Sequence, residues 1–297
     1  MTRLVFRPVL ALGLLCAALS AGAAESRLEL PPHPRLLANA ADWTRHKARL
    51  ATEPDLAAYH DALIAEARRL LAEPPVQRVM TGRRLLDVSR ELLRRVLLWS
   101  YAWQTTDDAT FARRAEQEML AAAGFTDWNP SHFLDVGEAA TALALGYDWL
   151  HEGLTPEARA TIRTALVEKG LRPGLDPEAS HNRWHRVENN WNQVCFGGLV
   201  LSALAVGDEV PEEAGRLLEL ARAGIGHGLK PYAPDGAYPE GPSYWGYGTT
   251  YQVLLIAAVE SALGTDWGMR SAPGFLASAG AYLQTTGATG RFWNFAD

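Results

Sequence analysis

Apolar positions recur at intervals of three and four residues along most of the chain, which is the period of an amphipathic α-helix. The first such stretch covers residues 41–71 and ends before Pro74 and Pro75, which cannot continue a helix. The same spacing predicts further helices over residues 83–103, 110–123, 139–150, 156–170, 193–206, 211–229, 245–263 and 273–284. No alternation typical of a strand interrupts them before the last residues. The sequence therefore predicts an all-α domain, and its periodicity leaves open a bundle, a solenoid or a closed ring of helical hairpins.

Residues with special preferences mark several of the expected helix ends. Asp107 or Asp108 can cap the helix over 110–123, and Gly124 can close it. Thr155 precedes Pro156, which is the arrangement of an N-cap followed by proline in the first helical position. These signals support the helical interpretation of the apolar spacing.

Composition narrows the class of protein. The 297 residues are 48% hydrophobic and 21% charged, which is typical of a folded domain with a sizeable core. The formal net charge of −6 argues against a nucleic-acid-binding protein, because neutralising phosphates requires a dense basic surface.

The N-terminal residues are typical of an export signal. Arg3 and Arg7 precede an apolar stretch over residues 9–19, and an Ala-Gly-Ala sequence ends at Ala23. This pattern predicts a secretory signal peptide over residues 1–23 and a mature protein that is periplasmic or secreted, with no membrane attachment after cleavage. The residues before Cys16 lack the usual lipoprotein pattern, so lipidation is the weaker alternative.

One cysteine, Cys195, remains after the predicted signal. A single cysteine cannot form an intramolecular disulfide, and it excludes a cysteine-rich metal site.

Two predicted loops, over residues 171–192 and 231–244, are dense in aromatic, amide, glycine and proline residues. Loops of this composition are more typical of ligand binding than of simple connections between helices. The candidate substrate-binding residues in and beside them are His181, Trp184, His185, Glu188, Asn189, Trp191, Glu240, Trp245 and Tyr247.

Each loop ends in a short motif that opens the next helix. The first motif is Asn189-Asn190-Trp191-Asn192-Gln193; the second is Glu240-Gly241-Pro242-Ser243-Tyr244, preceded by an Asp-Gly pair at 235–236. With the segment Pro-His-Pro-Arg-Leu-Leu over 32–37, the chain resembles the heparinase II/III-like group of polysaccharide lyases over most of its mature length.

The resemblance implies an (α/α) toroid followed by a β-sandwich, and cleavage of a uronate-containing acidic polysaccharide by β-elimination. It implies that Asn190 neutralises the uronate carboxylate, that Tyr244 moves the proton, and that a histidine of the β part completes the site. It implies no cofactor or metal. We therefore expect an incomplete toroid over residues 24–289. The alternating aromatic and polar residues 290–297 would begin the β region, with the third catalytic group beyond Asp297.

The chemistry needs these residue types. Removing the C5 proton of a uronate builds charge on a group that is already negative, so a donor to the carboxylate stabilises the enolate-like state. A tyrosine, with an ordinary pKa near 10, needs a nearby cation to act as a base. The local cationic candidates are His181, Arg183, His185 and Arg186.

Plainer interpretations stand beside these roles. Asn190 could cap the following helix, and Tyr247 or Tyr251 could replace Tyr244 as the base. His181 and His185 have the spacing of a zinc pair, but no glutamate stands between them as in the His-Glu-x-x-His motif. The glutamates of the two loops could stabilise the loops, and the tryptophans could be buried.

Two other functions remain open at the level of sequence. One is a glycoside hydrolase, with Glu188 or Asp235 paired with Glu240 as its two carboxylates. The other is a non-catalytic glycan-binding or truncated domain. The sequence does not choose among alginate, heparin, chondroitin and hyaluronan as the polymer, and it leaves the oligomeric state unknown.

Overall fold

The computed structural model describes residues 28–176 and 179–293. In this part of the chain the regular secondary structure is helical and there is no strand, which confirms the all-α class. The last described residues contain only an isolated antiparallel bridge between Thr286 and Phe292. The predicted signal peptide, residues 1–23, and the end of the chain from residue 294 lie outside the described residues.

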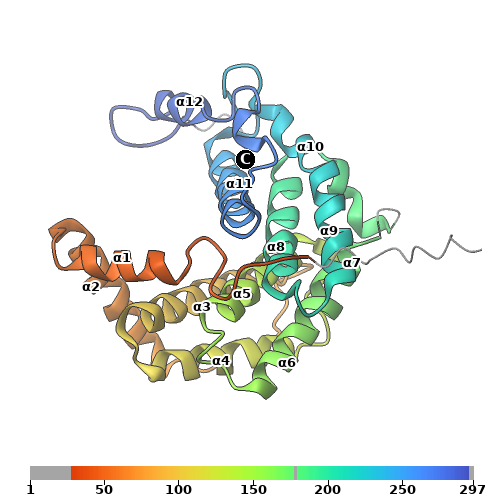
Figure 1. The fold of residues 1–297 in the computed structure, drawn as a ribbon. Helices are drawn as coiled ribbons and strands as arrows, with labels where there is room; N and C mark the ends of the chain where they lie inside the picture. The colour runs from red at the N-terminus through yellow and green to blue at the C-terminus, as the bar shows by residue number, and fades with distance from the viewer. Residues whose placement is uncertain (1–27, 177–178, 294–297) are drawn as a thin grey trace, which may run out of the picture.

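Alternate long helices pack side by side and form what we call the inner row. In order along the row, its members are α3 (Leu86–Thr106), α5 (Leu134–Trp149), α8 (Asn190–Val206) and α11 (Gly241–Leu263). Figure 1 shows that the chain follows a curve, from the orange and yellow helices through the green and teal ones to the blue helices.

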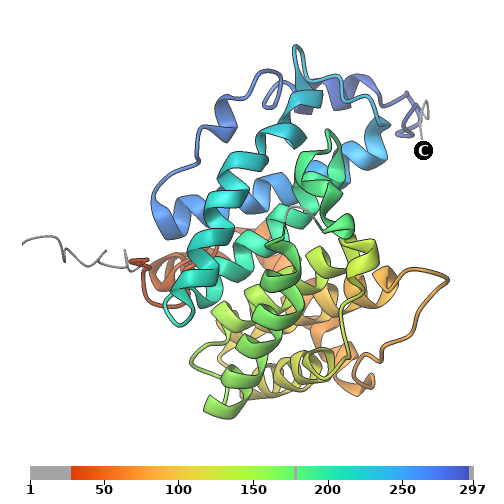
Figure 2. The same cartoon turned by 90° about the vertical axis from the view of Figure 1, so that its right-hand side faces the viewer.

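Shorter helices return the chain between members of the row. They are α1 (Ala40–Leu50), α2 (Pro54–Arg69), α4 (Ala109–Ala123), α6 (Pro156–Ala165), α9 (Pro211–Gly224) and α12 (Ser278–Gln284). A π-helical turn, η3 (Leu166–Leu171), continues α6, and the short helices α7 (Arg172–Gly174) and α10 (Gly226–Leu229) lie in loops. Figure 2 shows the teal helices α8 and α9 between the green helices and the blue ones.

The helices of the inner row all run in the same direction. Early residues of one helix contact early residues of the next, and later residues contact later ones. The contacting pairs are Arg90 with Glu138, Val96 with Gly146, Asn190 with Gly248, and Gly197 with Tyr251. The N-terminal ends of these helices therefore meet at one end of the row, which we call the polar end because of the side chains described below.

The middle of the row is buried on every side. All residues of α5 are buried, and so are all residues of α8 except Trp191. The two helices approach so closely that a Cβ on Gly198 would lie 2.0 Å from the carbonyl oxygen of Gly137. Because each helix is covered all round, neither has a polar face, and the apolar spacing marks them less clearly than it marks the surface helices.

Several predicted helix boundaries need correction. The stretch over 41–71 is divided into α1 and α2 because Pro54 starts a new helix, and residues 211–229 are divided into α9 and α10. Helices α5, α8 and α11 begin three to five residues earlier than predicted, because their first turns carry polar residues or glycine and proline. The C-terminal helix begins at Ser278, five residues later than predicted.

The cap predictions hold in part. Asp108 is the N-cap of α4, where its side chain accepts from the amide of Thr110, whereas Asp107 ends α3 in the left-handed conformation. Thr155 caps α6 as expected.

The N-terminal segment fastens the C-terminal ends of α5 and α8. Asp148 is fully buried and accepts hydrogen bonds from the ring of His33 and from the amides of Arg35 and Leu36. The buried guanidinium of Arg35 donates to carbonyl oxygens of residues 31, 204 and 205 and to Asp208. These donors occupy carbonyls at the last turn of α8, where a cation also matches the helix dipole.

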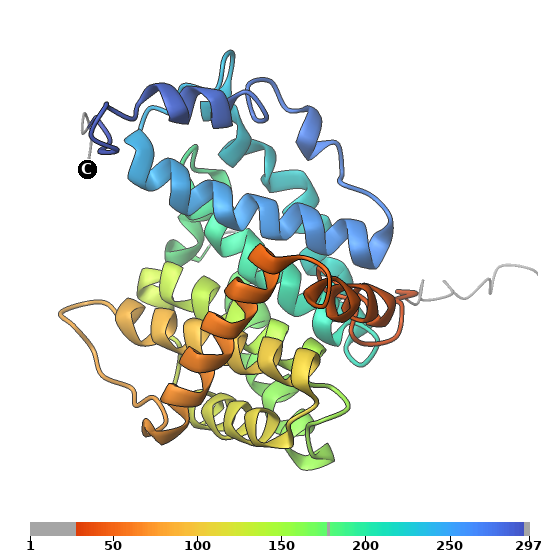
Figure 3. The same ribbon diagram turned by 90° about the vertical axis from the view of Figure 1, so that its left-hand side faces the viewer.

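Figure 3 shows the long helix α11 lying above the orange and yellow helices that start the fold. A contact between the amide of Leu37 and the hydroxyl of Ser261 joins the N-terminal segment to α11. Among the helices of the described part, none combines the length and apolar character needed to cross a membrane.

Candidate functional site

The polar end of the inner row gathers ionisable, amide and aromatic side chains from every helix of the row. They come from the first turns of the helices and from the loops that enter them. The set is Arg90, His132, Asp135, Glu138, Asn190, Trp191, Tyr238, Glu240, Tyr244, Tyr247 and Tyr251.

Asn190 is the first residue of α8, not its cap. The N-cap is Asn189, whose side chain accepts from the amide of Trp191 at 3.1 Å. Asn190 is buried, and its Nδ2 donates to both oxygens of Glu240, at 3.3 and 3.2 Å. Its Oδ1 is buried and accepts no hydrogen bond from the described residues. The helix-capping explanation for this asparagine therefore does not apply, since Asn189 performs that role.

Tyr244 lies between two residues that touch Asn190. Glu240 is the N-cap of α11 and its carboxylate accepts from Asn190, while Gly248, one helical turn after Tyr244, packs against Asn190. Tyr244 is half-buried, and among the described residues its hydroxyl has no hydrogen-bond partner. Asn190 and Tyr244 thus lie in the first turns of the neighbouring helices α8 and α11, at the polar end of the row.

Unlike Tyr244, Tyr247 has hydrogen-bond and ring contacts with charged side chains. Its hydroxyl donates to Glu138 at 2.5 Å, and the guanidinium of Arg90 lies 5.2 Å from the centre of its ring. Arg90 also donates to Glu138 at 3.1 Å. Burial and the charge of Glu138 raise the pKa of Tyr247 far above its ordinary value, and burial raises the pKa of Glu138. Burial likewise raises the pKa of Tyr251.

A histidine that the sequence analysis did not single out also lies at the polar end. His132 Nδ1 is 2.6 Å from Asp135, and its ring meets the edge of Trp191 with centroids 4.9 Å apart. Asp135 is fully buried and also accepts from the amide of Leu85 and the side chain of Asn129. The carboxylate therefore orients the imidazole.

The other predicted histidines do not join the site. His181 Nε2 lies 3.0 Å from the carbonyl oxygen of Pro173, and His185 Nε2 lies 3.0 Å from that of Gly174. Both rings must donate there, because a carbonyl oxygen only accepts. Burial lowers the pKa of His185 to about 4. Trp184 is buried between Phe133 and His185, so these side chains hold the loop together.

Glu188 forms an exposed ion pair with Lys230 at 2.7 Å, whereas the carboxylate that Asn190 contacts is that of Glu240. The loop cations Arg183 and Arg186 are exposed, whereas the cation that reaches the polar end is Arg90. Acidic residues inside the apolar run of α5 could have pointed to this part of the site, because Asp135 and Glu138 stand one helical turn apart there.

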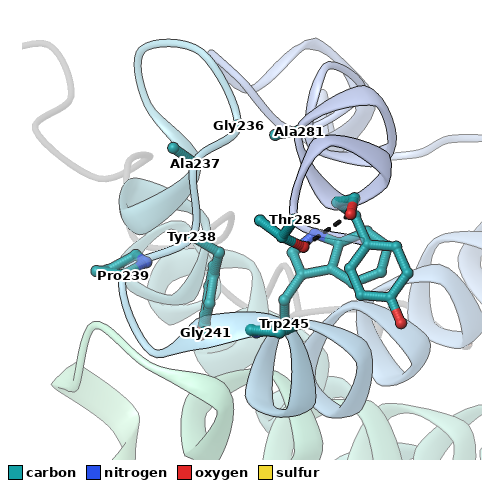
Figure 4. A pocket seen from close by; sticks show the side chains of 10 residues that line it. Gly236, Ala237, Tyr238, Pro239, Gly241, Trp245, Ala281 and Thr285 are labelled. Atoms are coloured by element: carbon teal, nitrogen blue, oxygen red, sulfur yellow. Dashed lines mark hydrogen bonds between the residues drawn. The ribbon is translucent and has the colours of Figure 1, made fainter. Parts of the chain in front are cut away.

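A small hollow adjoins the site on the other side of the loop over residues 236–242. It encloses about 170 Å³ between Tyr238 on one side and Trp245 on the other (Figure 4), and Tyr282 also lines it. The rings of Trp245 and Tyr282 are stacked, with centroids 4.0 Å apart and planes at 21°. Tyr238 connects the hollow to the site, because its hydroxyl donates to Glu240 at 3.1 Å.

Among the described residues, no three His, Cys, Asp or Glu side chains are placed so that they could hold a metal ion. No protein-family model matches the chain, and a comparison with curated proteins finds no match.

Proposed function

We propose that this chain is a polysaccharide lyase domain that cleaves a uronate-containing acidic polysaccharide by β-elimination, with Asn190 and Tyr244 as its catalytic residues. One observation carries the proposal: the Asn190 amide already holds a carboxylate, that of Glu240, and Tyr244, in the helical turn that follows Glu240, has a hydroxyl with no hydrogen-bond partner among the described residues. A donor to carboxylate and a nearby phenol are the two groups that the elimination requires.

The substrate carboxylate takes the Asn190 Nδ2 donor in place of Glu240, which keeps its hydrogen bond from Tyr238. The amide then stabilises the negative charge that grows on the carboxylate as the C5 proton leaves. Because an amide does not titrate, this stabilisation is independent of pH.

Tyr244 transfers the proton. As phenolate it takes the C5 proton, the electron pair of the C–H bond forms the C4–C5 double bond, and the C4–O bond breaks. The leaving glycosidic oxygen then receives that proton from the Tyr244 hydroxyl, which regenerates the phenolate. Atoms and charge balance without a cofactor.

The alternative bases are less suited. The Tyr247 hydroxyl already donates a hydrogen bond to Glu138, and burial opposes ionisation of this phenol. Tyr251 is buried, and desolvation opposes its ionisation too. The Tyr244 hydroxyl, by contrast, has no hydrogen-bond partner among the described residues.

The same proposal covers the architecture and the location of the protein. We infer that the curved row with its returning helices is part of an (α/α) toroid, as the resemblance to the heparinase II/III-like group implies. The signal predicted over residues 1–23 would deliver the domain to the periplasm or the exterior, where acidic polysaccharides are found.

The test is to incubate the protein with alginate, heparin, chondroitin and hyaluronan in turn, recording ultraviolet absorbance and reducing ends together. A lyase produces both signals, because each cleavage creates a C4–C5 double bond. Reducing ends without the absorbance would replace the proposal with a glycoside hydrolase. Binding of a polymer with neither signal would replace it with a non-catalytic glycan-binding domain.

A further inference from the structure

The aromatic hollow lined by Tyr238, Trp245 and Tyr282 continues the candidate site. Trp245 follows Tyr244 directly in α11, and Tyr238 touches both the hollow and the carboxylate of Glu240. The hollow is therefore joined through Tyr238 to the same carboxylate that Asn190 binds.

The size and the walls of the hollow suit one sugar ring. About 170 Å³ is less than the roughly 300 Å³ at which pockets for whole small molecules begin. Stacked aromatic rings form one wall, and their faces carry the partial negative charge that attracts the C–H groups of a pyranose ring. Pro239, Pro242 and Thr285 complete the surroundings without adding a charge.

The charge of the lining decides what kind of ring fits. None of the side chains that line the hollow, all of them in the described part of the chain, belongs to Lys, Arg, His, Asp or Glu. A carboxylate or sulfate placed there would lose its water without gaining a cationic partner, which is costly. Asn190, by contrast, supplies a donor to the carboxylate of Glu240, which Tyr238 of the lining also contacts.

We propose that the aromatic hollow is a subsite for an uncharged sugar, so that the substrate alternates uronate with a neutral ring and is not a homopolymer of uronate. This inference rests on the proposed function, which supplies the uronate position. It narrows the substrate class to unsulfated polymers of the alternating kind.

The test measures binding, which does not depend on turnover. A hyaluronan hexasaccharide, which alternates uronate with an uncharged N-acetylated sugar, is compared with a hexamannuronate by calorimetry. We expect the wild-type chain to bind the hyaluronan hexasaccharide about tenfold tighter or more. Equal or tighter binding of the hexamannuronate, or binding of neither, overturns the inference.

A substitution in the lining sharpens the test. Ala281→Lys places a cation at the hollow and should reduce the preference for the alternating oligosaccharide about tenfold, whereas Ala279→Lys adds the same charge to an exposed position of α12 outside the lining. Trp245→Ala should weaken binding of the hyaluronan hexasaccharide about tenfold, and a melting curve establishes that this variant is folded. If Ala281→Lys and Ala279→Lys behave alike, the inference is wrong.

These outcomes separate the inference from the function on which it rests. Suppose that the chain forms ultraviolet-absorbing product from a polyuronate and that Ala281→Lys does not change its preference between the two oligosaccharides. That result would support the lyase and overturn the neutral subsite. Suppose instead that the wild type shows the expected binding preference, that Ala281→Lys loses it, and that no polymer gives ultraviolet-absorbing product. That result would support the subsite and overturn the lyase.

Discussion

The two ends of the inner row differ in how completely their buried polar groups are bonded. At the C-terminal end, Asp148 receives three donors and the guanidinium of Arg35 finds four acceptors. At the polar end, Asn190 has a buried oxygen with no donor among the described residues, and the hydroxyl of Tyr244 is uncommitted. Buried polar groups are normally satisfied, so the incomplete end is where a ligand has something to add.

The same contrast appears within two residues of α8. Asn192 donates from Nδ2 to the carbonyl oxygens of Trp184, His185 and Gly224 and accepts from the amide of Gly228. Asn190 makes only long bonds to Glu240. The asparagine that is fully bonded holds the loop, and the other is available for chemistry.

The largest effect should come from Tyr244→Phe. This change removes the proton carrier and keeps the ring, so ultraviolet product formation should fall by about a hundredfold to ten-thousandfold while binding of an acidic oligosaccharide and the melting temperature stay the same. Tyr247→Phe is the matched control and should lose less. A Tyr244→Phe variant that keeps most of its activity would contradict the assignment.

At the opposite end, Asp148→Ala should lower the free energy of unfolding by about 3–5 kcal/mol, because it leaves a buried histidine and two amides without their acceptor. Urea denaturation at pH 7 measures it. Asp208→Ala is the control, since Asp208 is half-exposed and shares Arg35 with other acceptors, and it should cost less than about 1 kcal/mol. Equal losses of unfolding free energy in the two variants would contradict the prediction that the buried carboxylate of Asp148 contributes more to stability than the half-exposed carboxylate of Asp208.

The two asparagines of α8 should separate stability from activity. Asn192→Ala should cost more than about 2 kcal/mol of unfolding free energy, because several buried backbone groups lose their partner. Asn190→Ala should cost no more than about 1.5 kcal/mol, yet weaken both substrate binding and turnover. Urea curves and initial rates on both variants decide this, and a reversal of the two stability losses would refute the comparison.

Acid should weaken the first loop through His185. Its folded pKa of about 4 lies below the ordinary 6.5, so between these values the unfolded chain binds the extra proton. The stability that neutral, buried His185 contributes to the folded state is fully present above pH 6.5 and is lost as pH falls toward 4. As pH falls from 7 to 5, the melting temperature of the wild type should therefore fall more than that of His185→Gln. A constant difference would show that His185 does not titrate in this range.

The smallest effect should come from Glu188→Gln. The Glu188–Lys230 pair is exposed, and water screens such pairs strongly. Neither the urea midpoint nor the rate of ultraviolet product formation should change measurably. A large loss of activity would return Glu188 to the list of catalytic carboxylates.

The helical class could be predicted from the sequence because the outer helices have one apolar and one polar face. The first turns of α5 and α8 could not, because their polar residues are buried at the site, where amphipathic spacing carries no information. Asp135 and Glu138 interrupt an apolar helix for that reason. The motifs at 189–193 and 240–244 indicated Asn190 and Tyr244, but no local pattern could show that Arg90 and Tyr247 meet at Glu138, since that contact joins three helices.

The common direction of the inner helices has a consequence for how such a protein can change over evolution. Because each inner helix begins at the polar end, the connections that enter α5, α8 and α11 all arrive there, while the close contact between Val96 and Gly146 lies deeper in the row. Insertions and substitutions in those connections alter the chemistry presented to a ligand without disturbing the packed helices. One scaffold can in this way acquire new specificities by exchanging loops, and its selectivity can drift faster than its fold.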